Sequence, residues 1–283
     1  MKFRILSWNL FHGRDFPPPP GGDTPGVAEG GIAWRILGHP VAGKTHVRLN
    51  RDLFREFAAL LAAARWDIAL LQEVPPRWGH RLAEATGSSG RMALTSRNWL
   101  RPLMSPVARL RPHLAGSWEG GSNLILVRNA VPGLDGFRRG SEITDFRKTT
   151  LTWFPERRVM SMVELGCGLH VANFHASTGQ EAAADVMRTA RLADTRSGGG
   201  PLVLGGDFNA RPRNSDVFDR LEAEFGLSGV TSPGSIDHVL VRGVEPIEGP
   251  DAWPPARRDV PDPATSLLVR LSDHSPVVCR VVV

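Results

Sequence analysis

The spacing of apolar and polar residues predicts short β-strands along most of the chain. Apolar residues alternate with polar ones or form brief runs, which is typical of strands buried on one or both faces. These segments are residues 2–9, 66–75, 123–128, 159–165, 168–174, 201–204, 236–241 and 277–283. Apolar positions spaced as on one face of a helix predict helices over residues 49–64, with Asn50 as the N-cap, 180–193 and 215–225.

Proline and glycine interrupt this pattern in two places. Residues 17–20 are all proline and a glycine-rich stretch follows them, while a second proline-rich stretch covers about residues 246–264. Proline donates no backbone hydrogen bond, so we expect loops at both places. The sequence contains no internal repeat and no clear linker between domains. We therefore expect a single domain over residues 1–283 with loop insertions near residues 10–48 and 246–264.

The composition indicates a globular protein rather than a membrane or disordered one. The chain is 41% hydrophobic and 22% charged, which is an ordinary balance for a large core. It has no apolar run of the roughly 18 residues that span a bilayer, and its N-terminus is not typical of a signal peptide. We therefore predict a cytoplasmic protein without stable membrane insertion. The net charge of +5 favours a polyanionic partner without requiring one.

Polar side chains follow the buried strand that ends near residue 204. Gly205 and Gly206 are expected to turn the backbone sharply, and Asp207 and Asn209 come next, two residues apart. A carboxylate at the end of a buried strand needs a partner, and a hard cation with oxygen ligands is one. The alternative is a local turn in which the aspartate only closes the strand.

Similar polar residues occur where other predicted strands end. They include acids and amides, which suit a hard divalent metal, and histidines, which suit proton transfer or phosphate contact. The residues are Asn9, Glu73, Asn173, His175, Asp237, Asp273 and His274. No cluster typical of a zinc site and no G-x-S-x-G nucleophile motif is present. The candidate chemistry is therefore metal-assisted hydrolysis.

Six short segments resemble, in order, the motifs of the endonuclease/exonuclease/phosphatase superfamily with the DNase I-like fold. They are residues 7–9, 71–73, 173–175, 205–209, 236–238 and 272–276, so the resemblance spans nearly the whole chain. It implies an α/β protein of α+β type, built as a four-layer α-β-β-α sandwich of two packed mixed β-sheets with helices outside. It also implies metal-dependent hydrolysis of phosphate esters.

The resemblance assigns metal-binding roles by position. Asn9, Glu73 and Asp273 would hold Mg²⁺ or Mn²⁺. Asp207 and Asn209 would hold the attacking water, the scissile phosphate or a second metal.

The resemblance also assigns proton-transfer and substrate roles. Asp237 would pair with His274, and His175 would contact the phosphate or act as general acid. Asn173 is predicted to bind substrate. Either Asp207 or His274 would be the general base, because a positioned carboxylate or histidine can accept a proton near neutral pH.

The substrate prediction rests on basic residues. Residues 91–118 contain five arginines and no acid, and Trp99 and Trp118 lie among them. Arginines mixed with aromatic residues suit a nucleic-acid backbone and its bases, so Arg97 and Arg101 are predicted to contact substrate. Nucleic acid is therefore the first candidate substrate. A small-molecule or lipid phosphoester is the alternative, because His175 follows Phe174 where abasic-site endonucleases of this superfamily usually carry a tyrosine.

Residues 38–45 support a different hypothesis. They match the phosphate-binding loop G-x-x-x-x-G-K-[ST], with Lys44 as its lysine. Such a loop needs a strand before it and a helix that begins at the lysine. The segment of residues 32–37 is short for that strand and follows glycines, so a P-loop nucleotide-binding protein is a remote alternative.

His12 is close enough to Asn9 in sequence to line the site.

Overall fold

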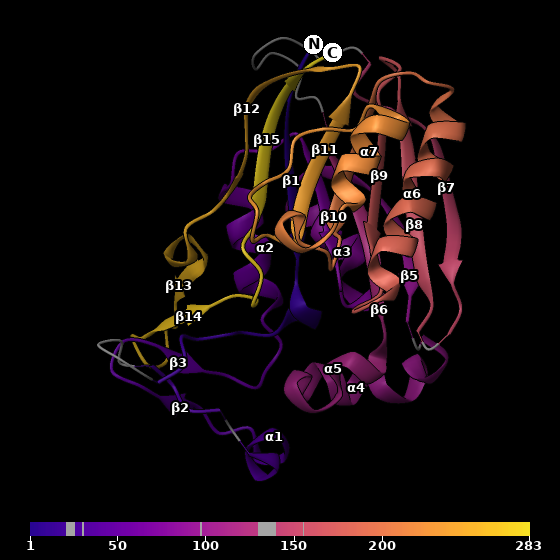
Figure 1. The fold of residues 1–283 in the computed structure, drawn as a ribbon. Coiled ribbons are helices and arrows are strands. Elements are labelled where there is room, and N and C mark those ends of the chain that lie inside the picture. Colours follow the sequence, from indigo (N-terminus) through magenta and orange to yellow (C-terminus); the bar gives the residue numbers. More distant parts are fainter. Residues whose placement is uncertain (21–25, 30, 97, 130–139, 155) are drawn as a thin grey trace.

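The computed structural model describes residues 1–20, 26–29, 31–96, 98–129, 140–154 and 156–283. Among these residues, two large β-sheets pack face to face and helices cover their outer sides (Figure 1). The four-layer α-β-β-α sandwich predicted from the sequence is confirmed. Both sheets are mixed, because β1 pairs with β4 and β9 pairs with β10 in parallel whereas the other pairs in these sheets are antiparallel.

The first sheet has the strand order β12-β15-β1-β4-β6-β5. Its strands are β1 (Lys2–Asn9), β4 (Ile68–Gln72), β5 (Ser88–Thr95), β6 (Gly121–Arg128), β12 (Glu245–Ala252) and β15 (Val277–Val282). The second sheet has the order β11-β10-β9-β8-β7. Its strands are β7 (Ile143–Thr152), β8 (Arg158–Leu165), β9 (His170–His175), β10 (Leu202–Asp207) and β11 (Asp237–Arg242).

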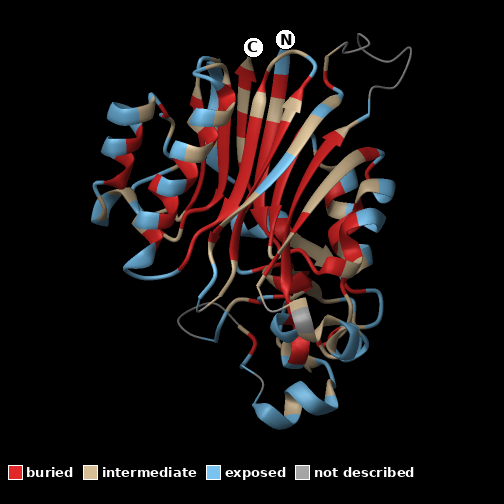
Figure 2. Ribbon diagram, turned by 90° about the vertical axis from the view of Figure 1, so that its right-hand side faces the viewer, coloured by how far each residue is buried: buried red, intermediate tan, exposed pale blue. Residues whose placement is uncertain are grey.

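Alternating side chains explain the layers. Between the sheets, Ile5 and Leu70 from one side meet Val171, Val203 and Val239 from the other. These side chains are buried because successive residues of a strand point to opposite faces, so each strand supplies one apolar row to this interface. The central strands are almost wholly buried (Figure 2).

Helices cover the two outer faces. On the first sheet, Phe57 and Leu61 of α2 (Phe54–Ala63) and Leu82 of α3 (Gly79–Ala85) join one buried cluster. On the second sheet, Val186 and Ala190 of α6 (Glu181–Ser197) belong to another cluster, which α7 (Val217–Phe225) extends. Each helix buries positions spaced three or four residues apart, as expected for an amphipathic helix on a sheet.

Smaller elements surround one end of the sandwich. They are α1 (Ile32–Leu37), α4 (Arg101–Leu110), α5 (Pro112–Glu119) and the strand pairs β2 (Val41–Ala42) with β3 (Val47–Arg48) and β13 (Asp259–Pro261) with β14 (Leu268–Arg270). Short 3-10 turns cover Phe11–Gly13, Pro76–Trp78, Asn98–Leu100, Pro212–Asn214 and Pro255–Arg258. In Figure 1, α1, α4 and α5 lie at the end of the sandwich opposite the chain termini.

The sequence-based prediction of a loop over residues 246–264 is partly wrong. Residues Glu245–Ala252 form β12, which pairs with β15 at the edge of the first sheet. An edge strand tolerates Pro246 and Pro250 because one side of it makes no ladder hydrogen bonds. The register also shifts between Pro246 and Glu248 and between Glu248 and Asp251, so Pro250 lies within an irregular part of the strand. The prediction of an N-cap at Asn50 is also wrong. The helix begins at Phe54, whose backbone N–H donates to the Asp52 carboxylate at 2.9 Å.

The expected turn at Gly205 and Gly206 is a continuation of β10 instead. Both glycines allow close approach. A Cβ on Gly205 would lie 2.5 Å from Leu70 Cδ1 of the other sheet, and one on Gly206 would lie 2.0 Å from the Phe174 carbonyl oxygen. Gly206 also has a φ of +150°, which side-chain-bearing residues rarely adopt. The glycines therefore bring the two sheets and the neighbouring strands together beneath Asp207.

The P-loop hypothesis is wrong. Residues Ile32–Leu37 form a helix rather than the required strand. Gly43 lies in the turn between β2 and β3, where its N–H donates to the His46 carbonyl at 2.8 Å. The following helix begins at Phe54, well after Lys44. The backbone N–H groups of residues 43–45 are therefore not arranged around a helix N-terminus.

Candidate active site

Strand register in the second sheet places three site residues side by side. Asp207 is the last residue of β10 and pairs with His175 of β9 on one side and Asp237 of β11 on the other. All three side chains are largely buried. His175 Nε2 lies 3.4 Å from Asp207 Oδ2. The row forms because three neighbouring strands reach the same rim of the sheet with their polar residues at matching positions.

The first sheet adds an amide from its central strand. Asn9 ends β1, and its side-chain Nδ2 donates to Asp207 Oδ2 at 3.1 Å, across the space between the sheets. The Asn9 Oδ1 accepts a hydrogen bond from the Phe11 backbone N–H at 2.9 Å. This pair of hydrogen bonds fixes the orientation of the amide. Asn9 therefore connects the turn after β1 to the acid row of the second sheet.

Glu73 follows directly after β4, next to Asn9 at the same rim. Its backbone φ is +49°, an uncommon value that turns the chain immediately after the strand. Its carboxylate lies 3.1 Å from His12 Nε2 and 3.8 Å from His175 Nδ1. Burial alone would raise the pKa of Glu73, but His12, His175 and Arg14 lower it to about 2. Glu73 is therefore an ionised carboxylate.

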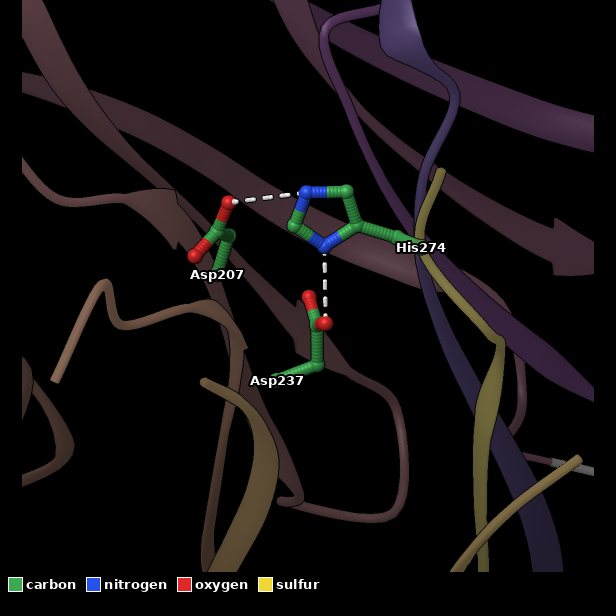
Figure 3. Close-up of side chains that lie close together, drawn as sticks. All are labelled: Asp207, Asp237 and His274. Atoms are coloured by element: carbon green, nitrogen blue, oxygen red, sulfur yellow. Dashed lines mark hydrogen bonds and ion pairs between the residues drawn. The ribbon is translucent and has the colours of Figure 1, made fainter. Parts of the chain in front are cut away.

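The histidine of the last motif contacts two acids. His274 Nδ1 lies 2.8 Å from Asp237 Oδ2, and His274 Nε2 lies 3.8 Å from Asp207 Oδ2 (Figure 3). Asp273 Oδ1 also lies 3.8 Å from His274 Nε2. Burial by itself would lower the pKa of His274, but these carboxylates raise it to about 10, with Asp237 contributing most. The imidazole is thus held in the orientation that its bond to Asp237 requires.

A turn lets adjacent residues Asp273 and His274 serve one site. Ser272 has a φ of +60°, and its hydroxyl donates to the Asn9 carbonyl at 2.6 Å while accepting from the His274 backbone N–H at 3.1 Å. The Trp8 indole N–H donates to the His274 carbonyl at 2.9 Å. These bonds hold the turn against the end of β1. In an extended strand, Asp273 and His274 would point to opposite faces and could not both reach the site.

Asp207 is the most strongly perturbed acid of the row. Burial raises its pKa, the facing charge of Asp237 raises it further, and the result is about 7. His274 and the hydrogen bonds from Asn9 and the Asn209 backbone oppose this rise. Two carboxylates opposite one another on neighbouring strands repel, so the cluster favours cations or protons between them.

Asn209 takes part in a local turn and also lies beside the site, so both interpretations of residues 207–209 apply to it. Its backbone N–H donates to Asp207 Oδ1 at 3.0 Å, which is the local turn considered from the sequence. Its side-chain Nδ2 donates to the Ala176 carbonyl at 3.0 Å, which leaves Oδ1 as its remaining polar atom. Asn209 therefore orients the carboxylate of Asp207 and stays next to the site.

Asn173 is not placed to bind substrate, so this prediction is wrong. The side chain is fully buried between the sheets. Its Oδ1 accepts from Gln72 Nε2 at 2.8 Å, and its Nδ2 donates to the carbonyls of Leu71 and Leu124. Because residues two apart on a strand share a face, Asn173 lies beneath His175. It connects the two sheets below the site.

The predicted substrate contacts of Arg97 and Arg101 stay predictions. Arg97 lies outside the described residues. Arg101 is the first residue of α4. Burial raises the pKa of Glu119, and the charge of Arg101 opposes this rise. Arg111 donates to the carbonyls of Ile36 and Leu37 at the end of α1, so its guanidinium has a structural role.

The segment after β1 contributes two further groups. His12 is buried against Glu73, and its Nδ1 has no hydrogen-bond partner among the described residues. Arg14 donates to the Phe11 carbonyl at 3.0 Å, lies over the Phe11 ring, and interacts electrostatically with Glu73 and Asp273. The sequence indicated His12 only weakly and Arg14 not at all. The available signal was the close spacing of both residues to Asn9.

The donor atoms fit a hard divalent metal. Glu73, Asp273 and Asn9 offer carboxylate and amide oxygens at one rim, and oxygen ligands are what Mg²⁺ and Mn²⁺ prefer. Burial raises the pKa of Asp273, and the negative charge of Glu73 raises it further. A cation between these carboxylates would relieve that repulsion. Asp207, Asp237 and His274 also have donor atoms within 4.8 Å of one another, but His274 Nδ1 is already engaged by Asp237.

The fold and the buried acids and histidines at the rim of the sandwich define a hydrolase-type site. The sequence profile of the endonuclease/exonuclease/phosphatase family matches residues 6–274. The chain belongs to this family, whose members are hydrolases acting on phosphoester bonds, and the resemblance drawn from the six motifs is confirmed. No curated protein sequence matches the chain.

Solved structures share the fold over nearly all of the chain. Mannosyl-6-phosphatase from Bacteroides thetaiotaomicron VPI-5482 has a TM-score of 0.61 at 14% identity, covering 99% of this chain and 100% of that one. The human nocturnin catalytic domain with bound sulfate has a TM-score of 0.60 at 15% identity, with coverages of 99% and 94%. TDP2 from D. rerio with a single-strand DNA product has a TM-score of 0.53 at 14% identity, with coverages of 100% and 99%. At such identities, the likeness is one of fold.

Proposed function

We propose that this protein is a Mg²⁺- or Mn²⁺-dependent phosphoesterase. The observation that carries the proposal is the position of Asp207. Its carboxylate accepts a hydrogen bond from Asn9 and lies within 3.8 Å of ring nitrogens of both His175 and His274. Groups for metal binding and groups for proton transfer thus meet around one carboxylate, as hydrolysis of a phosphoester requires.

Glu73, Asp273 and Asn9 are the proposed ligands of the metal. A divalent cation bound there would stabilise the negative charge that develops on the phosphoryl oxygens. Arg14, close to both acids, would contribute positive charge at the same rim. His12 holds one oxygen of Glu73 at 3.1 Å, which orients the carboxylate.

Proton transfer is assigned to Asp207 and the Asp237–His274 pair. Asp237 fixes His274 through Nδ1 and leaves Nε2 facing Asp207 and Asp273 at 3.8 Å. The 3.8 Å between Asp207 Oδ2 and His274 Nε2 is longer than a direct hydrogen bond, so a water or phosphate oxygen bound beside them could contact both. We propose that Asp207 accepts the proton of the attacking water, while His274, whose pKa the neighbouring carboxylates raise, stays protonated and donates a hydrogen bond to the bound oxygen. His175 would donate a hydrogen bond to the phosphate or to the leaving oxygen.

Three substrate classes remain in this proposal. Nucleic acid is supported by the basic composition and by the fold shared with TDP2, which binds a single-strand DNA product. A lipid phosphoester is supported by a specific observation: α4 and α5, beside the site, expose large apolar side chains. A soluble phosphoester is consistent with the fold shared with mannosyl-6-phosphatase.

A substrate panel and a metal-binding measurement test this proposal together. The panel compares plasmid DNA, RNA, inositol phosphates, sphingomyelin and bis(p-nitrophenyl) phosphate with Mg²⁺, Mn²⁺ or EDTA. Glu73→Gln is expected to reduce metal-dependent hydrolysis to background and to abolish the rise in melting temperature caused by Mn²⁺, because the lost charge belongs to a ligand. Glu222→Gln, at an exposed position of α7, is the matched control. Hydrolysis in EDTA at the full rate, or an unchanged Mn²⁺ shift in Glu73→Gln, would refute the assignment.

A further inference from the structure

The helix α4 exposes the apolar side of its surface. Leu103 and Leu110 are 69% and 65% exposed, and Val107 between them is also exposed. These residues are four and three positions apart, so they lie on one face of the helix. On α2 and α6, by contrast, the apolar face is buried against a sheet. An apolar stripe that faces water on a folded protein indicates an interaction surface for a protein, a membrane or a ligand.

Helix α5, which packs on both α4 and α1, and helix α1 also expose apolar side chains. On α5, Leu114 and Trp118 are exposed, and on α1, Ile32 is 76% exposed with Ile36 and Leu37 beside it. We name these side chains the apolar helix face: Ile32, Ile36, Leu37, Leu103, Val107, Leu110, Leu114 and Trp118.

The three helices are fixed to one another. Arg111, between α4 and α5, donates to the carbonyls of Ile36 at 2.8 Å and Leu37 at 2.9 Å. The rings of Trp34 and His113 are 5.0 Å apart, and Asn50 donates to the Arg35 carbonyl while accepting from the His113 N–H. These contacts hold the three helices together in the free protein, so the apolar helix face is already formed before a partner binds.

This face lies next to the catalytic rim. Helix α5 packs on the Phe11–Gly13 turn, where a Cβ on Gly116 would lie 3.3 Å from His12 Cβ. Trp153 and Phe154, after β7, are also exposed. The segment that follows them contacts the segment before α4, because the Ser96 N–H donates to the Arg157 carbonyl. In Figure 1, α1, α4 and α5 lie at the end of the sandwich opposite the chain termini, and β1, which starts near the N-terminus, has Asn9 as its last residue. Whatever covers the apolar helix face is thus brought to the mouth of the site.

The two chain segments that carry the face contain basic side chains and no acidic ones. Residues 31–51 and 85–118 contain no aspartate and no glutamate, but they include Arg35, Lys44, Arg101 and Arg109. Of these, Arg35, Lys44 and Arg109 are exposed and Arg101 is partly exposed. Basic residues beside exposed Leu, Ile and Trp are the combination that binds the interface of an anionic lipid layer.

Other occupants fit these features less well. A second copy docking through the same face would bring the arginines of both copies together with no carboxylate from residues 31–51 or 85–118 to pair with them. Nucleic acid would neutralise the arginines but would leave the aliphatic side chains of α1 and α4 without an apolar partner. A lipid surface supplies both the anionic headgroups and the apolar boundary. No helix in the described part of the chain is long and apolar enough to cross a membrane, so the contact would be peripheral.

We propose that the apolar helix face docks on an anionic lipid surface and presents the catalytic rim to it. The docking needs no hydrolysis, so it can be tested apart from the proposed function. The test is co-sedimentation with vesicles of phosphatidylcholine, with and without phosphatidylglycerol. The wild-type chain is expected to sediment with the anionic vesicles, and less so in high salt.

A matched pair of double variants tests the surface. Leu103→Glu/Leu110→Glu is expected to weaken binding to anionic vesicles by at least about tenfold, because two exposed leucines that would enter the lipid interface are replaced by charges that anionic headgroups repel. Val230→Glu/Ile247→Glu changes two exposed apolar residues elsewhere and should bind like the wild type. Arg101→Glu/Arg109→Glu should lose the preference for anionic over neutral vesicles. Equal melting temperatures and equal hydrolysis of bis(p-nitrophenyl) phosphate for the leucine variant establish that it is folded.

Three results would overturn the proposal: no wild-type binding to either vesicle, equal binding by the leucine variant, or a concentration-dependent dimer that the leucine variant abolishes. The last result, seen by sedimentation velocity, would identify a second copy as the occupant. Binding by Glu73→Gln at the wild-type level separates docking from catalysis. If that variant binds vesicles but the wild type hydrolyses nothing, the proposed function fails and the docking surface stands.

Discussion

Two regions of this chain carry residues in a spacing typical of phosphate chemistry, and the structure treats them differently. The strand-end residues, from Asn9 to His274, converge at one rim of the sandwich and contact one another. Residues 38–45 match a phosphate-binding loop but form parts of a turn and a two-residue strand before the hairpin partner β3. The second region matches the sequence motif, but it lacks the preceding strand and the following helix that would orient its backbone N–H groups toward a phosphate.

The comparison teaches that a motif acts through the element that holds it. In the first region, each polar residue ends a strand whose neighbours are set by a ladder of hydrogen bonds, so Asp207 meets His175 and Asp237 by register. In the second region, no ladder connects Lys44 to the acids of the site. The following predictions compare the two regions, from the largest expected effect to the smallest.

The largest effect is expected from the Asp237–His274 pair. His274→Ala and Asp237→Asn are each predicted to lower kcat by roughly 10²-fold or more, the usual contribution of positioned acid–base catalysis. The double variant should be little worse than His274→Ala, since the acid acts through the 2.8 Å bond to the histidine. Asp219→Asn, exposed on α7, is the control. If the two losses multiply in steady-state kinetics, the residues act separately and the pair has no joint role.

An intermediate effect, on stability rather than activity, is expected from a second histidine beside Asp237. His238 is fully buried, with Nδ1 accepting from the Thr231 N–H and Nε2 facing the Ser235 carbonyl. Both contacts suit the neutral ring, and burial lowers the pKa of His238 from 6.5 to about 4 although Asp237 opposes this. Between those pH values, the unfolded chain binds more protons than the folded chain. The free energy of unfolding therefore falls as the pH drops from 6.5 towards 4.

Replacement of His238 measures its share of this pH dependence. Between pH 6 and 5, His238→Gln should flatten the slope of the unfolding free energy by up to about 1 kcal/mol per pH unit, the contribution of one proton. The measurement is urea denaturation at a series of pH values, with the exposed His80→Gln as the control. Equal slopes for His238→Gln and the wild type would mean that His238 binds a proton in the folded protein as readily as in the unfolded chain.

The smallest effect is expected from Lys44→Ala. Lys44 is exposed in the turn between β2 and β3, so its removal should leave phosphoesterase activity within about threefold of the wild type. Isothermal titration with ATP should show no tight binding by either protein. If the wild type bound ATP tightly and Lys44→Ala abolished that binding, residues 38–45 would be a nucleotide-binding loop despite their hairpin geometry.

Some of this protein could be predicted from the sequence because local pattern determines it. The apolar pattern located most strands of the two large sheets but missed β5, β7 and β12, and the position of Asp207 after residues 201–204 marked a polar strand end. The six motifs in order predicted the sandwich, which the fold confirms. In these cases, the burial of one face is encoded in neighbouring residues, so a short window is sufficient.

Only the tertiary structure decided which polar residues face the site and which support it. Asn173 and His175 lie two residues apart, yet Asn173 bonds Gln72 inside the sandwich whereas His175 faces Asp207. Gly205 and Gly206 resembled a turn, but they continue β10, and they are glycines because a side chain there would collide with Leu70 or with the backbone of Phe174. The exposure of Leu103 and Leu110 was equally hidden, since an apolar helix stripe has the same spacing whether a sheet covers it or not. Each of these outcomes depends on contacts between residues far apart in the chain, which local spacing does not specify.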